Sequence, residues 1–151
     1  MAADQIQRSR AIWNGTWSLD QLHELTRGTL VEHLGIEFTS IEDDELRARL
    51  AVRPQTAQRL GFLHGGASLA LAETVGSIAS QMCIDPGFAS MGLEINANHV
   101  RPAQQGQFVE AIARPIHLGR KTQIWDVRVE SAEGKLVCIA RLTTSIQASK
   151  T

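Results

Sequence analysis

Cysteine is scarce in this sequence, occurring only as Cys83 and Cys138 among 151 residues. Two cysteines can form at most one disulfide, and a chain of this length buries enough apolar surface to fold as one domain without it. We therefore expect both to be small buried side chains in a reducing compartment.

Long apolar runs are also missing. No uninterrupted stretch is long enough to cross a membrane, and residues 1–10 are polar, without the apolar segment of a secretion signal. We therefore expect a soluble cytoplasmic protein with no membrane partner.

The chain has no excess charge of either sign, since 15 lysines and arginines are matched by 16 acidic residues. This balance argues against binding along a nucleic-acid backbone, so we expect no nucleic-acid partner. The histidines have no metal-ligand spacing with one another or with the cysteines, which excludes the usual metal motifs. We predict no metal site.

The hydrophobic period changes along the chain and predicts its elements. A capping box at Ser18-Leu19-Asp20-Gln21 predicts a short helix to about residue 27, ended by Gly28. Alternating apolar residues predict a hairpin over residues 36–52 and strands near 91–97, 108–114, 125–129 and 136–142. Residues 65–83 form one long helical segment, with an apolar stripe at Leu71, Val75, Ile78 and Met82.

These elements predict an α+β fold. One helix cannot cover both faces of a six-stranded sheet, so a curved antiparallel sheet should wrap its apolar face around one long central helix. Short turns separate the last four strands, which leaves no room for crossover helices. We therefore expect those strands to form a meander.

Glu73 is the first candidate for chemistry. It is the only acidic residue between Arg59 and Asp85, a stretch without lysine or arginine, and it lies opposite the apolar stripe. A solvated face ordinarily carries charges, whereas this face carries small residues: Gly66, Ala70, Gly76, Ser77 and Ser80. The pattern favours close approach of another surface or ligand. Glu73 then suits a base or nucleophile, with a solvated or structurally paired glutamate as an equal alternative.

The segment Gly61-Phe62-Leu63-His64-Gly65-Gly66 leads directly into the same helix. Paired glycines leave the amides of the first turn open, where the helix dipole favours a negative oxygen. This arrangement predicts an oxyanion site with the Gly65 N–H as donor, while His64 orients the loop or polarises the same carbonyl. Glycines that only cap the helix are the alternative.

His64-Gly65-Gly66, followed by an acid eight residues after Gly65, resembles the hotdog-fold acyl-CoA thioesterases. The resemblance is to the phenylacetate-degradation-like branch, nearest to the Glu-dependent 4-hydroxybenzoyl-CoA thioesterases, and it covers roughly residues 34–146. It implies a hotdog thioesterase domain over residues 31–151, preceded by an N-terminal helical extension over residues 1–30. The implied reaction, in aromatic degradation, is hydrolysis of 4-hydroxybenzoyl-CoA to 4-hydroxybenzoate and CoA. No cofactor is implied, because coenzyme A is part of the substrate.

Carried onto this chain, the resemblance assigns Glu73 as nucleophile or general base and the Gly65 amide as the group polarising the thioester carbonyl. Gln58 and His64 become supporting groups, with Gln58 binding the leaving thiolate or a lytic water, and Ser77 hydrogen-bonds the carboxylate. Alternatively, Gln58 is a surface glutamine and Ser77 bonds its own helix. The family pairs its subunits at the active site, so a homodimer is the implied minimal unit and a homotetramer the implied assembly. Gln58, His64 and Gly65 would come from one subunit, and Glu73 and Ser77 from its partner.

For the CoA phosphates the resemblance points to the basic turn Arg120, Lys121 and Thr122, with Arg101 as a second candidate. A merely solvated turn is the alternative.

Two other functions remain open at this point: a non-catalytic acyl-CoA-binding module, and a hotdog hydratase or dehydratase acting on an acyl thioester. A hotdog thioesterase that acts on a different acyl chain is a further alternative.

Overall fold

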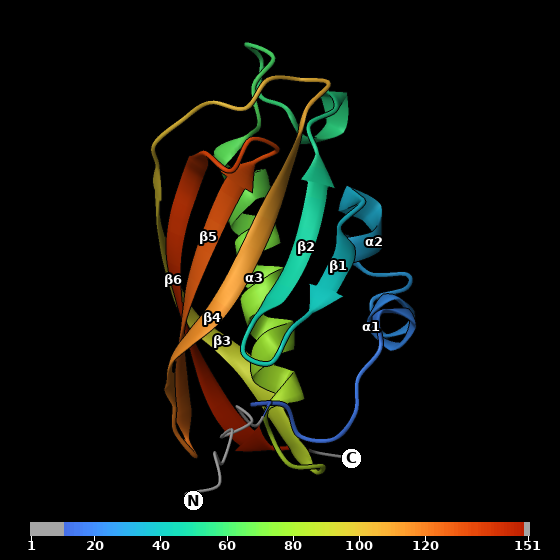
Figure 1. The fold of residues 1–151 in the computed structure, drawn as a ribbon, viewed down its shortest axis with the longest axis vertical. Coiled ribbons are helices and arrows are strands. Elements are labelled where there is room, and N and C mark those ends of the chain that lie inside the picture. The colour runs from blue at the N-terminus through green and yellow to red at the C-terminus, as the bar shows by residue number, and fades with distance from the viewer. Residues whose placement is uncertain (1–10, 150–151) are drawn as a thin grey trace, which may run out of the picture.

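A computed structural model describes residues 11–149 and places one long helix against a six-stranded antiparallel sheet (Figure 1). The helices are α1 (Leu19–Leu25), α2 (Leu30–Leu34) and α3 (Gly65–Met82), with a 3-10 turn at Pro54–Thr56. The strands are β1 (Glu37–Ile41), β2 (Leu46–Ala51), β3 (Phe88–His99), β4 (Phe108–Leu118), β5 (Thr122–Ser131) and β6 (Leu136–Ala148).

The strand order is β1-β2-β4-β5-β6-β3, which confirms the meander only for β4, β5 and β6. The prediction that β3 neighbours β4 is wrong, because β3 pairs with β6 at the far edge of the sheet. The connection over residues 100–107 crosses the end of the sheet, at the top of Figure 1. Eight extended residues reach about 26 Å, while three strand spacings need only about 14 Å. The eight residues between β3 and β4 are therefore long enough to join strands that are not neighbours in the sheet.

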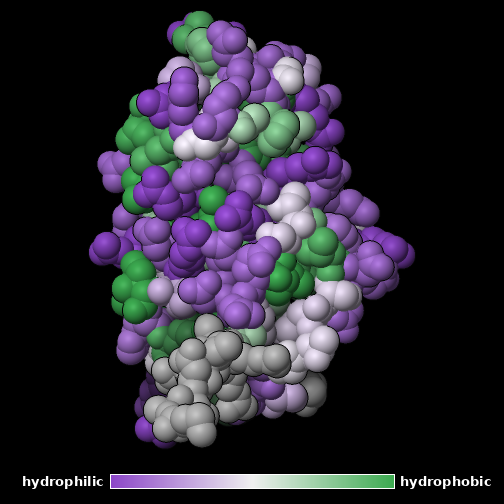
Figure 2. Space-filling view, in the orientation of Figure 1, coloured by the Kyte–Doolittle hydropathy of each residue, from purple (hydrophilic) through white to green (hydrophobic). Residues whose placement is uncertain are grey.

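The core lies between α3 and the concave face of the sheet. Leu71, Val75 and Ala79 of α3 are fully buried, as are Trp125 and Leu142 of the strands. α3 contacts every strand from β2 to β6, which confirms the predicted wrapping of the sheet around the helix. In the view of Figure 1, β2, β4 and β5 lie in front of α3, and Figure 2 shows that this side of the molecule is mostly hydrophilic.

The capping box at the start of α1 is confirmed. The Gln21 N–H donates to Ser18 Oγ at 3.2 Å, and the Ser18 N–H donates to Gln21 Oε1 at 2.8 Å. α1 ends at Leu25, earlier than predicted, and Leu22 is fully buried in the core. The first ten residues of the predicted extension lie outside the described residues.

Two features were not predicted. α2 is capped by Thr29 and ends at Gly35, which has a left-handed φ of 74°. β4 continues past residue 114 to Leu118 because a register shift after Pro115 absorbs the proline. α2 depends on its caps and the extension of β4 depends on strand pairing, and neither is visible as a hydrophobic period in the sequence.

Candidate active site

The first part of the site is the N-terminus of α3. His64 is the N-cap residue, and its Nδ1 accepts the Gly66 N–H at 2.8 Å. Because Nδ1 is an acceptor there, a neutral His64 carries its proton on Nε2. The N–H groups of Ala67 and Ser68 both donate to the His64 carbonyl. Within residues 11–149 the Gly65 N–H has no hydrogen-bond partner, so it is an open donor at the positive end of the helix dipole.

Gln58 lies in the loop that precedes α3. Its N–H donates to the Phe62 carbonyl at 2.8 Å, and its carbonyl accepts the Gly61 N–H at 2.9 Å. The side-chain Oε1 accepts the Leu60 N–H. These bonds join Gln58 to Phe62, two residues before His64, and the side-chain NH₂ of Gln58 has no partner among the described residues.

Glu73 lies at the middle of α3, where its side chain is half-buried. Ser77, one turn further along, donates its hydroxyl to Glu73 Oε1 at 3.0 Å, which is the first of the two predicted alternatives for this side chain. The carboxylate also lies against β3: a Cβ at Gly92 would overlap Oε1 and would be 3.4 Å from the carboxylate carbon. No salt bridge involves Glu73 within the described part of the chain, so its charge has no cationic partner there.

The small-residue face around Glu73 is narrower than predicted. Gly76 packs against the sheet, where a Cβ would be 2.6 Å from Leu142 Cδ2, and Ser80 is fully buried. The Ser80 hydroxyl donates to Gln123 Oε1 at 2.7 Å and contacts Thr144 Oγ1 at 2.9 Å. The curved sheet covers more of the helix circumference than the apolar stripe alone indicated, so these two residues belong to the core.

Glu73 and the open Gly65 amide are separated along one helix. Eight residues of α-helix rise about 12 Å, whereas a nucleophile and an oxyanion donor must both lie about 3 Å from the same carbonyl group. Within one chain the structure therefore does not bring these two groups together. It does place His64 and Gly65 at the start of α3, with Gln58 in the loop that leads to them, and it places Ser77 beside Glu73.

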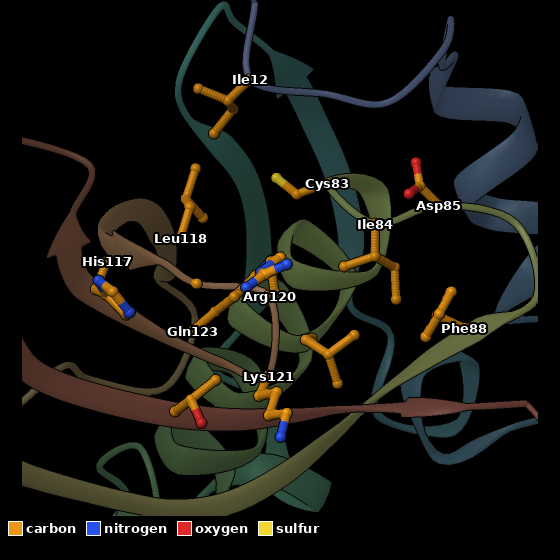
Figure 3. A pocket seen from close by; sticks show the side chains of 13 residues that line it. Ile12, Cys83, Ile84, Asp85, Phe88, His117, Leu118, Arg120, Lys121 and Gln123 are labelled. Carbon is orange, nitrogen blue, oxygen red and sulfur yellow. The ribbon is translucent and has the colours of Figure 1, made fainter.

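The predicted phosphate-binding residues lie at the opposite end of α3. Arg120, Lys121 and Thr122 line a cleft of about 890 Å³, together with Cys83 and Ile84 at the end of the helix. Figure 3 shows Arg120 among the lining side chains, with Ile84 and His117 on opposite sides. The cleft also contains one carboxylate, Asp85, whose Oδ1 accepts the Asn14 side-chain N–H at 2.7 Å.

Arg101 is not part of this cleft. It follows the end of β3, and its side chain donates to the Leu136 carbonyl at 2.6 Å. It is exposed and retains further N–H donors for another ligand. The structure therefore separates Arg101 from the other three predicted phosphate-binding residues.

The two cysteines are both free, and neither is suited to act as a nucleophile. Cys138 is buried as predicted, whereas Cys83 is only partly buried. Burial raises the pKa of Cys83 to about 12 and also raises the pKa of Cys138. Both side chains therefore remain protonated thiols at neutral pH, and the thiolate is the reactive form.

Two residues next to the Gly65 amide were missed from the sequence. Ser68 is buried and donates its hydroxyl to the Gly65 carbonyl at 3.0 Å. His99, at the end of β3, has its Nδ1 3.3 Å from the same hydroxyl and its Nε2 3.1 Å from where a Gly65 Cβ would lie. Ser68 and His99 meet only because β3 lies beside α3, and no local sequence pattern predicts a contact between them.

Two negative findings concern the described residues alone. Residues 11–149 contain no group of three His, Cys, Asp or Glu side chains arranged to hold a metal ion. None of the helices in the same range is both long enough and apolar enough to span a bilayer.

Comparison with known proteins identifies the family. The model of the thioesterase superfamily matches residues 60–138, which include Gly65 and Glu73. The 1,4-dihydroxy-2-naphthoyl-CoA hydrolase of Escherichia coli is 43% identical over 135 residues, covering 89% of this chain and 98% of the relative. The proofreading thioesterase EntH of Cronobacter turicensis is 44% identical with the same two coverages.

Solved structures agree. A thioesterase of Pseudomonas aeruginosa, crystallised as a glutamine-to-alanine mutant, is 42% identical with a TM-score of 0.89, covering 92% of this chain and all of that one. A Staphylococcus aureus protein is 36% identical in two crystal structures, with TM-scores of 0.76 and 0.75. The first is a glutamate-to-alanine mutant, and the second is a glutamine-to-alanine mutant described as a thioesterase enzyme. These two structures cover 80% and 78% of this chain, and 99% and 98% of their own. The chain therefore belongs to the thioesterase superfamily and is a thioester hydrolase with the hotdog fold.

Proposed function

We propose that this enzyme hydrolyses hydroxylated aromatic acyl-CoA thioesters, with 4-hydroxybenzoyl-CoA as the first substrate to test. Glu73 is the nucleophile or general base, and the Gly65 amide polarises the thioester carbonyl. Gln58 and His64 support the reacting groups from the loop, and Ser77 orients the carboxylate. Each active site combines the loop of one subunit with the α3 carboxylate of a second copy.

The observation that carries this proposal is the open Gly65 N–H on the same helix as an unpaired carboxylate about 12 Å away. One group is the donor that a developing oxyanion needs, and the other is the base or nucleophile that the reaction needs. A second copy of α3 lying antiparallel to the first would place each carboxylate beside the other copy's amide. Two sites would then form about one twofold axis.

The edge of the sheet supports such pairing. β3 is a twelve-residue edge strand, and its Met91 and Leu93 side chains are 55% and 62% exposed. A long exposed edge strand leaves one row of backbone N–H and C=O groups unpaired, and pairing with a second copy would satisfy them. The same strand packs on Glu73, so this contact would lie next to the proposed site.

The chemistry can follow two balanced routes. In the first, a Glu73 oxygen attacks the thioester carbon, the C–S bond breaks, and CoA leaves as the thiolate while a mixed anhydride remains for water to hydrolyse. In the second, Glu73 takes a proton from water and the resulting hydroxide attacks the same carbon. The C–S bond then breaks, and CoA leaves as the thiol after taking the proton back from Glu73. In both, negative charge develops on the carbonyl oxygen, and the Gly65 N–H would stabilise it by donating a hydrogen bond. Oxygen-18 from solvent appearing in Glu73 after a single turnover distinguishes the covalent route.

CoA would lie along α3, with its phosphates at the basic turn. The end of α3 at the cleft is about ten residues, or about 15 Å, beyond Glu73. That separation suits the extended pantetheine arm of CoA. Arg120 and Lys121 then supply charge-assisted hydrogen bonds to phosphate, and Thr122 adds a hydroxyl. Arg101, which lies outside the cleft, is proposed as a second residue that contacts a CoA phosphate.

Two comparisons support the substrate class and the residues. The Escherichia coli relative is named for a hydroxylated aromatic acyl-CoA, which is the class proposed here. The glutamine and glutamate replaced in the Staphylococcus aureus structures are fifteen positions apart, the spacing of Gln58 and Glu73 in this chain.

The test measures free-thiol release from 4-hydroxybenzoyl-CoA, 1,4-dihydroxy-2-naphthoyl-CoA, unsubstituted benzoyl-CoA and decanoyl-CoA. We expect the highest kcat/KM on a hydroxylated aromatic thioester. The substrate assignment fails if decanoyl-CoA is preferred. Glu73→Ala should lower kcat by about 10²–10⁴-fold, while Glu24→Ala, which removes an exposed helical glutamate, should leave it unchanged. Full turnover by Glu73→Ala would overturn the assignment of the carboxylate.

A further inference from the structure

The Glu73 carboxylate is held from two sides. On one side, the Ser77 hydroxyl donates to Oε1 at 3.0 Å. On the other side lies the backbone of β3 at Gly92, where a Cβ would overlap Oε1. The carboxylate thus occupies the space that any other residue at position 92 would fill with its side chain.

Backbone conformation does not explain this glycine. Seven glycines of the described chain have positive φ, the region that disfavours other residues, and Gly92 is not one of them. The three nearest atoms that a Cβ at position 92 would meet all belong to Glu73, so a side chain here would disturb that carboxylate first. The strand register also shifts between Gly92 and Glu94, which marks a bulge beside the carboxylate.

The position of Gly92 is in turn fixed by α3 itself. Gln81 lies two turns beyond Glu73 on the same side of the helix. Its Nε2 donates to the Phe88 carbonyl at 3.2 Å, and its Oε1 accepts the Ser90 N–H at 2.9 Å. Both bonds reach the first half of β3, two and four residues before Gly92. α3 therefore carries the Glu73 carboxylate and also holds, through Gln81, the strand β3 that packs against that carboxylate.

We propose that Gly92 is a positioning residue that sets the side-chain conformation of Glu73, with Gln81 holding Gly92 in place. The inference rests on the proposed role of Glu73 as the catalytic carboxylate. A methyl group at position 92 displaces the carboxylate away from β3 and from the direction in which Ser77 holds it. Displacement by about 1 Å is enough to lower the rate of a positioned reaction by about 10²-fold.

The experiment compares kcat, KM and melting temperature for Gly92→Ala with those of the unmodified enzyme. We expect kcat to fall by about 10- to 100-fold, with KM changed less than about twofold. Gly134→Ala is the matched control: φ at Gly134 is +73° and its Cβ would meet nothing within 4 Å. It should lower the melting temperature while leaving kcat of the folded enzyme intact.

A double-mutant cycle with Glu73→Asp tests the contact itself. The shorter side chain withdraws from position 92, so Gly92→Ala should lower the residual rate of Glu73→Asp by less than about twofold. Gln81→Met, which keeps the length and removes both hydrogen bonds to β3, should lower kcat in the same direction. If Gly92→Ala does not fold, Gln81→Met still tests whether β3 positions the Glu73 carboxylate.

Different results overturn different claims. If Glu73→Ala abolishes turnover while folded Gly92→Ala or Gln81→Met retains kcat within twofold, the positioning role is wrong and the proposed function stands. Equal losses from Gly92→Ala in both backgrounds of the cycle would also overturn it. If Glu73→Ala retains turnover, the proposed role of the carboxylate itself fails.

Discussion

Ser80 provides the sharpest test of how α3 packs in the sheet. Its hydroxyl is fully buried and joins three partners: Gln123 Oε1 at 2.7 Å, Thr144 Oγ1 at 2.9 Å and Ser90 Oγ at 2.7 Å. In Ser80→Ala, Gln123 keeps the Trp125 indole N–H at 3.2 Å, whereas the Thr144 and Ser90 hydroxyls lose their partner. The orphaned Thr144 hydroxyl is fully buried and costs about 1–3 kcal/mol, whereas the Ser90 hydroxyl is only partly buried and adds about 1 kcal/mol or less. We therefore expect the free energy of unfolding to fall by about 2–4 kcal/mol, and the melting temperature to fall by roughly 5–15 °C.

The assay is denaturant and thermal unfolding at fixed protein concentration, because association would otherwise change the apparent stability. Ser80→Ala combined with Thr144→Val removes one of the orphaned hydroxyls. The double variant should therefore be at least about 1 kcal/mol more stable than the sum of the two single losses predicts. A loss below about 0.5 kcal/mol for Ser80→Ala would refute the buried network. It would mean that Ser80 lies on an open face of α3, as the sequence pattern predicted.

Two further predictions concern the cleft at the end of α3. Burial raises the pKa of Cys83 to about 12 from an ordinary 9.0, so its alkylation by iodoacetamide at pH 8 should be about 10²–10³-fold slower than that of an exposed thiol. Mass spectrometry follows the labelling, and half-maximal reactivity near pH 9 would contradict the burial argument. In Gly119→Ala, the new Cβ would lie 2.5 Å from His117 Nε2 and 2.6 Å from the Thr122 carbonyl, which must distort the basic turn. KM for CoA thioesters should rise about tenfold with kcat unchanged, and an equal rise with pantetheine thioesters would show that the turn does not bind the CoA phosphates.

The strands and the long helix were predictable because each follows one hydrophobic period. Alternation identified the two strands of the hairpin and the four later strands, and the stripe at Leu71 and Val75 identified α3 and its buried side. The pairing of β3 with β6 was not predictable, because loop length limits reach without selecting a neighbour. α2 was missed because five residues are too few to show a period.

The candidate site was predictable only where its residues follow one another in sequence. His64, Gly65 and Glu73 share one motif, and Ser77 follows Glu73 by one helical turn. The roles inferred for Gly92 and Gln81, and the contact of His99 with Ser68, depend on β3 lying along α3. Such contacts join residues far apart in the chain, and no local pattern encodes them. The same limit explains why Gly76 and Ser80 were assigned to the wrong face.

We propose that each active site is built from two chains, and mixing two inactive variants tests this most directly. The variants Gln58→Ala/His64→Ala and Glu73→Ala are mixed, dissociated and reassociated. Free-thiol release is then measured with 4-hydroxybenzoyl-CoA or with the best substrate of the panel. Random pairing makes half of the dimers mixed, and each mixed dimer has one of its two sites intact, so activity should return to about a quarter of the unmodified level. If mixed dimers form and no activity returns, the loop and the carboxylate act within one chain, and the account is wrong.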